Sequence, residues 1–249
     1  MLLEAKGLSK SFGGIHAVSA VDLYVPEKSI IAVIGPNGAG KTTFFNMVTG
    51  VYSPDAGSLV LDGESLLNTS ADQIALKGIA RTFQTIRIFR GMTVLENVLV
   101  SQAMRVPHGL SAIFRTAAYC RKEQAAINFA FECLERVGLG GVSQEIASCL
   151  SYGQQRCLEI ARALALKPRV LLLDEPAAGM NAQEKAVVIH LVKVLKEELG
   201  ISIVLIEHDM EMVAKLADRV TVLHHGQVLA EGEPAEISRH PDVIAAYLG

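Results

Sequence analysis

The residues with the clearest chemical meaning form the stretch GPNGAGKT, residues 35–42. It fits the pattern G-x-x-x-x-G-K-[ST], with an apolar β-type run, Ile30–Ile34, before it and a helical pattern after it. Glycines let backbone N–H groups approach phosphate oxygens with no Cβ in the way, and a helix N-terminus adds the positive end of its dipole. The sequence therefore predicts a loop that holds phosphate groups, rather than a glycine turn that contains a lysine by chance.

Two side chains of this phosphate loop, as residues 35–42 are called below, have expected roles of their own. The ammonium of Lys41 should reach the β- and γ-phosphates, and the hydroxyl of Thr42 should bind Mg²⁺, which prefers oxygen ligands. The residues predicted to bind the nucleotide at this loop are Gly35, Pro36, Asn37, Gly38, Ala39, Gly40, Lys41, Thr42 and Thr43.

A pair of carboxylates follows a second apolar run, in VLLLDEP, residues 170–176. The run reads as a buried strand, and ligands of α/β sheets bind at the carboxyl ends of the strands. Asp174 is expected to orient Mg²⁺ directly or through water, and Glu175 to polarise the water that attacks the γ-phosphate. The alternative is a strand that simply ends in surface acids.

The elements that must position these groups alternate between β and helical patterns, which predicts an α/β fold with a mainly parallel sheet. The runs RVLLLDEP and ISIVLIEHD read as buried strands separated by a helix, and residues 92–166 carry a helical period with few strand signals. A hairpin is expected to turn at His225 and Gly226, and the tail to break at Pro241. An all-helical part therefore interrupts the α/β chain.

The overall composition excludes several classes of protein. The chain has 249 residues, a formal net charge of −3 and a pI near 6.2. It therefore lacks the excess of positive charge that is typical of nucleic-acid-binding proteins. No apolar run approaches the ~20 residues that a membrane-spanning helix needs, and the N-terminus lacks the apolar segment of a secretion signal. The mean hydropathy of +0.33 fits either a large core or an exposed apolar patch for a partner. We expect the chain to stay in the cytosol.

The cysteines show no pattern for zinc or for a disulfide framework. The chain has 4 of them, at Cys120, Cys133, Cys149 and Cys157, and none forms a CxxC pair. We expect buried, reduced thiols.

The stretch LSYGQQR, residues 150–156, indicates which class of phosphate-binding protein this is. This signature turn precedes a helical run and then the acidic strand, an order that resembles the ATP-binding cassette (ABC) family, whose signature is LSGGQ. Tyr152 departs from that signature, where glycine is usual. The resemblance implies that Ser151, Gly153 and Gln154 bind the ATP of a second cassette in a head-to-tail dimer. The alternative is a polar N-cap, Ser151, ahead of an amphipathic helix.

The same resemblance implies further site residues. Gln84, in RTFQ, matches a glutamine that senses Mg²⁺ and water, and His208, in IEHDM, matches a histidine that contacts the γ-phosphate; both are expected to act with Glu175 in catalysis. Phe12 resembles the aromatic residue that stacks on adenine, with Val18 beside it, although Phe replaces the usual Tyr and a core position is the alternative. ATP and Mg²⁺ are the implied cofactors. The residues implied to hold Mg²⁺ are Thr42, Gln84 and Asp174.

The resemblance covers essentially the whole chain and implies a single ABC ATP-binding domain, residues 1–249. A RecA-like core with an antiparallel β subdomain is expected from residues 1–84 and 167–249, and a helical subdomain that carries the signature turn from residues 85–166. Asn181 departs from the resemblance, because aspartate is usual at this position in a loop that contacts the dimer partner.

One cassette without a membrane span implies separate partners. We expect two transmembrane permease subunits to dock near QTIRIFRGMTVLENVLV, a second ABC ATPase to complete the dimer, and a solute-binding protein to take part indirectly. The chain would then be a peripheral subunit at the cytoplasmic face of the inner membrane.

Several stretches resemble the Liv-type ATPases of branched-chain amino acid importers, which implies ATP-driven uptake of branched-chain, hydrophobic amino acids. They are FGGIHAV, GIARTFQTIRIFRGMTVLENVLVSQ, LSYGQQR, LDEPAAGMN, the insert RVPHGLSAIFRTAAYCRKE and the ending IAAYLG. A lipid or lipopolysaccharide exporter ATPase and a related amide or urea importer share most of these motifs and stay open. A soluble kinase or GTPase has no role for LSYGQQR, and a DNA-repair cassette would bring zinc modules or a coiled coil.

Overall fold

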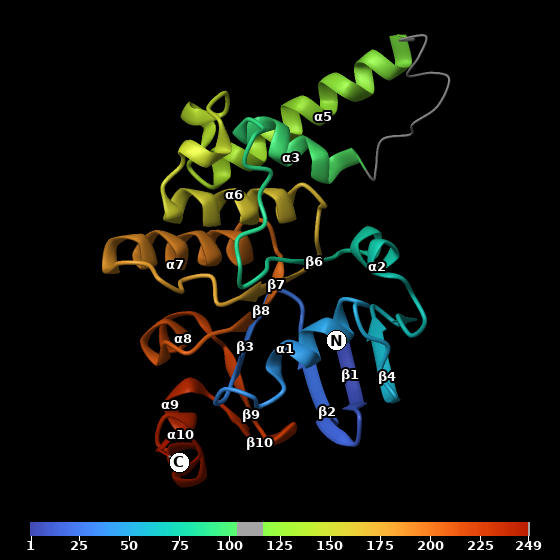
Figure 1. Ribbon diagram of the computed structural model, residues 1–249, viewed down its shortest axis with the longest axis vertical. Coiled ribbons are helices and arrows are strands. Elements are labelled where there is room, and N and C mark those ends of the chain that lie inside the picture. Colours follow the sequence, from blue (N-terminus) through green and yellow to red (C-terminus); the bar gives the residue numbers. More distant parts are fainter. Residues whose placement is uncertain (104–116, 249) are drawn as a thin grey trace.

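A six-stranded sheet lies in the middle of the molecule (Figure 1). The computed structural model describes residues 1–103 and 117–248, and its sheet has the order β10-β9-β3-β8-β7-β6, parallel throughout except for the β9–β10 pair. Its strands are β3 (Ile30–Ile34), β6 (Ile79–Arg81), β7 (Val170–Asp174), β8 (Ser202–Ile206), β9 (Arg219–His224) and β10 (Gln227–Gly232). The predicted parallel sheet is confirmed, and so is the hairpin turn, where His225 and Gly226 both have positive φ.

The register of this sheet brings three strand ends to the same level. Ile206 of β8 pairs with Val33 of β3 on one side and with Asp174 of β7 on the other. The segments that follow these strands are the phosphate loop, Glu175 and the stretch containing His208. Parallel pairing therefore gathers the expected chemistry at one edge of the sheet.

The second sheet is antiparallel, with the order β2-β1-β4-β5. Its strands are β1 (Leu3–Phe12), β2 (Ile15–Val25), β4 (Ala56–Leu61) and β5 (Glu64–Ser65). Helix α1 (Lys41–Val48) buries Phe44 and Phe45 in one cluster with residues of both sheets, so the helix that follows the phosphate loop is held between them.

The other helices include α2, whose Ile74 belongs to the cluster around α1, and a larger group that covers the opposite face of the six-stranded sheet and extends away from it (Figure 1). They are α2 (Ala71–Lys77), α3 (Val94–Gln102), α5 (Ala117–Arg136), α6 (Tyr152–Leu164), α7 (Ala182–Glu197), α8 (Met210–Leu216), α9 (Pro234–Ile237) and α10 (Pro241–Leu248). Between β6 and β7 the described residues form helices and turns. Residues 104–116, which include the first part of the insert RVPHGLSAIFRTAAYCRKE, lie outside the described part. The tail was expected to form a short helix, a break at Pro241 and a last helical turn, and this is confirmed: α9 ends at Ile237 and α10 begins at Pro241, where the missing N–H of proline costs nothing.

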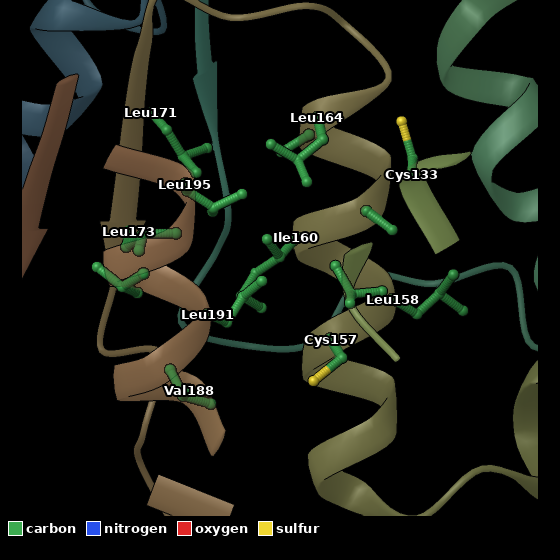
Figure 2. Packing of buried hydrophobic residues seen from close by; sticks show 14 of the residues in the cluster. Cys133, Cys157, Leu158, Ile160, Leu164, Leu171, Leu173, Val188, Leu191 and Leu195 are labelled. Carbon is green, nitrogen blue, oxygen red and sulfur yellow. The ribbon is translucent and has the colours of Figure 1, made fainter. Parts of the chain in front are cut away.

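The core explains why α6 is held firmly. Alternate residues of β7 point to opposite faces of the sheet, so Leu171 and Leu173 face α7 while Val170 and Leu172 belong to the cluster around α1. Figure 2 shows α6 beside α7, with Ile160 directed toward Leu191. Burying side chains of this size stabilises the fold by about 1.5–3 kcal/mol each.

In the described part of the chain, no helix is both long and apolar enough to cross a membrane.

All four cysteines are free thiols, but they are not all buried. Cys133 and Cys157 are buried, and burial raises the pKa of each thiol to about 11. Cys149 is exposed and Cys120 is half-buried. The expectation of buried thiols was therefore wrong for Cys149, because the short turn before the signature turn points its side chain outward.

Iodoacetamide at about pH 8 is expected to modify Cys149 quickly in the folded chain and to leave Cys133 and Cys157 unmodified, because the thiolate is the reactive form and both buried thiols stay protonated and covered. Mass spectrometry of peptides checks this, with a guanidinium-unfolded sample as the control in which every cysteine reacts. Equal rates for Cys157 and Cys149 in the folded chain would contradict the placement of α6.

Candidate nucleotide-binding site

The phosphate loop has a backbone that only glycine tolerates at two positions. Gly35 has a φ of 147°, and a Cβ there would overlap the carbonyl oxygen of Leu223. Gly40 has a φ of 99°, and a Cβ there would overlap the carbonyl oxygen of Ala17. The loop therefore runs tightly between β9 and β2 before it enters α1.

A cavity of about 260 Å³ lies beside this loop and gathers most of the predicted site residues. It is lined by Ala17, Asn37, Gly38, Ala39, Gly40, Lys41, Thr42, Thr43, Gln84, Glu175 and His208. Apart from Ala17, which lies on β2, these residues come from segments after β3, β6, β7 and β8, so the sheet edge described above forms most of the cavity wall.

Lys41 is folded onto its own loop. Its Nζ donates hydrogen bonds to the carbonyl oxygens of Gly35, at 2.6 Å, and Pro36, at 2.9 Å. Burial lowers the pKa of Lys41, and the negative charges of Glu175 and Asp174 oppose that shift. The ammonium is thus held by the loop carbonyls and feels the charge of two carboxylates, and it offers an incoming anion a preformed positive partner.

Glu175 is the centre of a three-residue cluster. Its Oε1 lies 2.7 Å from Nε2 of His208, and its Oε2 accepts a hydrogen bond of 2.9 Å from Nε2 of Gln84. Glu175 also has a φ of 48°, a left-handed conformation that costs a non-glycine residue about 1–3 kcal/mol and recurs at functional sites. Its N–H donates to the carbonyl of Ile206 at 2.9 Å, which holds this conformation in place. The structure thus brings together residues that are far apart in sequence.

Asp174 is buried, with 2% of its surface exposed, and pairs with a residue that the sequence analysis missed. Nη2 of Arg81 lies 2.7 Å from its Oδ2. The only sequence signal for Arg81 is its place in the RTFQ stretch that supplied Gln84.

Glu207 is a second missed residue, and it fixes the two loops that carry Glu175 and His208. One carboxylate oxygen accepts the N–H of Ala177 at 3.2 Å, and the other accepts the N–H of His208 at 3.1 Å. Burial raises the pKa of Glu207. Its sequence signal was slight, an acid directly after a buried strand.

The donor set fits a magnesium ion that shares its coordination with a nucleotide. Thr42 offers a hydroxyl, Gln84 an amide oxygen and Asp174 a carboxylate, all of them oxygen ligands. Within the described residues, no three His, Cys, Asp or Glu side chains are grouped to hold a metal alone. Such an ion would therefore depend on phosphate oxygens as well.

The two residues predicted to contact adenine, Phe12 and Val18, differ in their exposure to solvent. Phe12 is 42% exposed, so it is not a core residue; its ring centre lies 5.2 Å from that of Tyr52, in an edge contact, and 5.7 Å from Nζ of Lys10. Val18 has no exposed surface and packs beneath Gly40, whereas its neighbour Ala17 lines the cavity. Direct contact between Val18 and adenine is therefore not supported, because β2 turns this side chain into the core.

The signature turn lies away from this cavity, at the start of α6 (Figure 1). Ser151 caps the helix: its hydroxyl accepts the N–H of Gln154 at 3.3 Å, and the Gln154 side chain accepts the N–H of Ser151 at 2.9 Å. Gly153 lies close to α7, where a Cβ would meet Glu184 at 2.9 Å. Asn181 is the N-cap of α7, and its side chain accepts the N–H groups of Gln183 and Glu184. The structure therefore does not bring Ser151, Gly153 or Gln154 to the phosphate loop of the same chain.

A buried ion pair between Arg156 and Glu159 connects α6 to the segment that contains Gln84. Nη1 of Arg156 lies 3.0 Å from Glu159 and donates to the carbonyl of Phe83 at 2.6 Å, while Nη2 donates to the carbonyl of Gln84. Glu159 in turn accepts the N–H of Arg87 at 2.8 Å. Burial raises the pKa of Glu159, and Arg156 opposes the shift. Helix α6 and the Gln84 segment are therefore fastened together.

The chain is similar in sequence to known proteins. A protein-family model described as "ABC transporter" matches residues 18–178, and one described as "Branched-chain amino acid ATP-binding cassette transporter" matches residues 227–249. The high-affinity branched-chain amino acid transport ATP-binding protein BraF of Pseudomonas aeruginosa is 46% identical over 249 residues, which span 100% of this chain and 98% of BraF.

Solved structures agree in fold. A crystal structure of the ADP conformation of MJ1267, an ATP-binding cassette of an ABC transporter, aligns with a TM-score of 0.88 at 32% identity, over 100% of this chain and 98% of that chain. A dimeric structure of the cassette MJ0796, in a post-hydrolysis state bound to ADP and Pi, aligns with a TM-score of 0.77 at 26% identity, over 94% and 99%. The expected fold class and resemblance are confirmed. With a family match over more than half of its length and a relative 46% identical from end to end, the chain belongs to the ABC transporter family, as an ATP-binding cassette.

Proposed function

We propose that this chain is the ATP-hydrolysing subunit of an importer for branched-chain, hydrophobic amino acids. The observation that carries the ATPase assignment is the cluster of Glu175, His208 and Gln84 beside the phosphate loop. The names of similar proteins and the C-terminal family match support the class of transported solute. Lipid exporters and amide or urea importers are the alternatives that the test below separates.

In the proposed reaction, the N–H groups of the phosphate loop and the ammonium of Lys41 hold the phosphates of ATP. Glu175 accepts a proton from the attacking water, His208 keeps the carboxylate oriented, and Gln84 helps to place the water. Mg²⁺, bound near Thr42, Gln84 and Asp174, would neutralise charge that develops on the phosphate oxygens.

A second cassette is needed to complete the site. Ser151, Gly153 and Gln154 lie away from the cavity of their own chain, so we infer that a head-to-tail partner delivers them to the γ-phosphate. The dimeric cassette bound to ADP and Pi supports this arrangement. Two ATP molecules would then lie between two cassettes, of which the other is a copy of this chain or a related ABC ATPase.

Two membrane permease subunits are proposed to dock on the helical part, and a solute-binding protein to act through them. Phe89, Met92 and Ile146 are 43%, 38% and 41% exposed, and the isolated pairing of Thr93 with Ile146 places the last two close together. Arg156 and Glu159 connect this region to Gln84, which gives movement there a route to Glu175. The cassette would therefore lie on the cytoplasmic face of the inner membrane as a peripheral subunit, with no role for nucleic acid.

Cells that lack this chain are expected to lose most uptake of radiolabelled leucine, and the wild-type chain should restore it. Lys41→Ala is the matched control, because it removes the phosphate-binding ammonium; its cellular level should be checked by immunoblot. Loss of amide or urea uptake with normal leucine uptake would favour the related importer, and lipid accumulation inside the cell would favour the exporter. Either outcome overturns the proposed substrate.

A further inference from the structure

Arg81 is held by two polar side chains at the edge of the candidate site. Its side chain is 5% exposed, and its Nη2 lies 2.7 Å from Oδ2 of Asp174. Its Nη1 donates a hydrogen bond of 2.6 Å to Oδ1 of Asn46 on α1. Within the described part of the chain, Nε has no hydrogen-bond partner. The guanidinium is thus aimed specifically at the aspartate and at the helix that follows the phosphate loop.

Two aromatic rings hold the same guanidinium. Its central carbon lies 5.4 Å from the ring centre of Phe45 and 5.2 Å from that of Phe83. Phe45 precedes Asn46 on α1, and Phe83 precedes Gln84. A planar cation between aromatic faces is well placed for cation–π attraction and cannot rotate easily. Arg81 therefore joins the phosphate-loop helix, the end of β7 and the Gln84 segment.

The charge of Arg81 matters because the site must accept both a polyanion and a divalent cation. Asp174 and Glu175 already act on Lys41 electrostatically, so the cavity feels both carboxylates. A cation paired with Asp174 weakens the attraction of that carboxylate for a metal ion and reduces its repulsion of phosphate.

We propose that Arg81 is a positioning residue that holds Asp174 by Oδ2, leaves the other carboxylate oxygen outside the ion pair as the one that would serve Mg²⁺, and lets the site bind ATP before Mg²⁺ arrives. The proposal rests on the nucleotide-binding function above. It goes further by giving the chain a charge balance that sets how strongly it prefers Mg-ATP to metal-free ATP. The ion pair is buried, so solvent screens it little.

The test measures the dissociation constant of a fluorescent ATP analogue for the full chain, in EDTA and again in Mg²⁺. The dissociation constant in EDTA divided by that in Mg²⁺ is the ratio of interest. It is expected to rise about ten-fold in Arg81→Gln, which is equivalent to about 1.4 kcal/mol. Arg81→Lys keeps the charge and is expected to keep the ratio near the wild-type value. The control is Arg169→Gln, which removes an arginine whose side chain is 44% exposed and paired with Asp62 on the surface.

A second variant covers the case in which Arg81→Gln fails to fold, as judged by its melting temperature. Asn46→Asp keeps the guanidinium but offsets its charge with a carboxylate on Nη1, so the ratio should again rise. An unchanged ratio in a folded Arg81→Gln, or in Asn46→Asp, overturns the proposal while leaving the ATPase assignment intact. A wild-type chain that binds the analogue in neither buffer contradicts the proposed function itself, and with it the role of Arg81.

Discussion

Glu175→Gln is expected to lower the rate of ATP hydrolysis by about 10²–10⁴-fold while leaving ATP binding nearly unchanged. An amide has nearly the shape of the carboxylate and its oxygen can still accept the hydrogen bond from Gln84, so the cavity should keep its form. It cannot take a proton from water, however. The variant should accumulate with ATP bound, as a dimer in the presence of its partner cassette.

Hydrolysis is followed by phosphate release and assembly by size-exclusion chromatography with ATP. Glu197→Gln is a suitable control, because it makes the same chemical change at an exposed position at the end of α7. If Glu175→Gln turns over ATP at the wild-type rate, Glu175 is not the base, and the short contact to His208 has another purpose. A loss of ATP affinity in the variant would instead indicate that the carboxylate shapes the binding site.

Arg156→Met is expected to lower the free energy of unfolding by about 3–5 kcal/mol, because it leaves the buried carboxylate of Glu159 without its partner. It also removes the donors that hold the carbonyl groups of Phe83 and Gln84. Urea unfolding followed by circular dichroism measures the change. Gln84 should then be held less firmly against Glu175, so hydrolysis should fall even at temperatures where the variant remains folded.

The double variant Arg156→Met, Glu159→Gln should recover part of this stability, since no charge is then left unpaired. The effect of Arg156→Met also depends on pH. Burial already raises the folded-state pKa of Glu159, and removing Arg156 raises it further. The folded form then holds a proton that the unfolded chain has released, so the stability deficit is smallest at low pH and grows as pH rises through the folded-state pKa. A deficit that does not vary with pH would show that Glu159 is not the group responsible.

Local patterns were enough to predict several features of this protein. The phosphate loop is one, because the spacing of its glycines and Lys41 along a strand, a turn and a helix is set within a few residues. The acidic end of β7 is another, since a run of apolar residues followed by Asp174 and Glu175 has one plausible place in a buried sheet. The α/β fold class and the β9–β10 hairpin follow from the same kind of short-range signal.

Contacts between side chains that are far apart in sequence were decided only by the tertiary structure. The Glu175 contacts to Gln84 and His208 span 91 and 33 residues, and nothing near Arg81 in sequence indicates Asp174, which lies 93 residues away. Whether Val18 faces the cavity or the core is likewise decided by how β2 packs. Whether a side chain is buried depends on which segments pack together and exclude water. A buried charge pairs with the oppositely charged group that this packing places next to it.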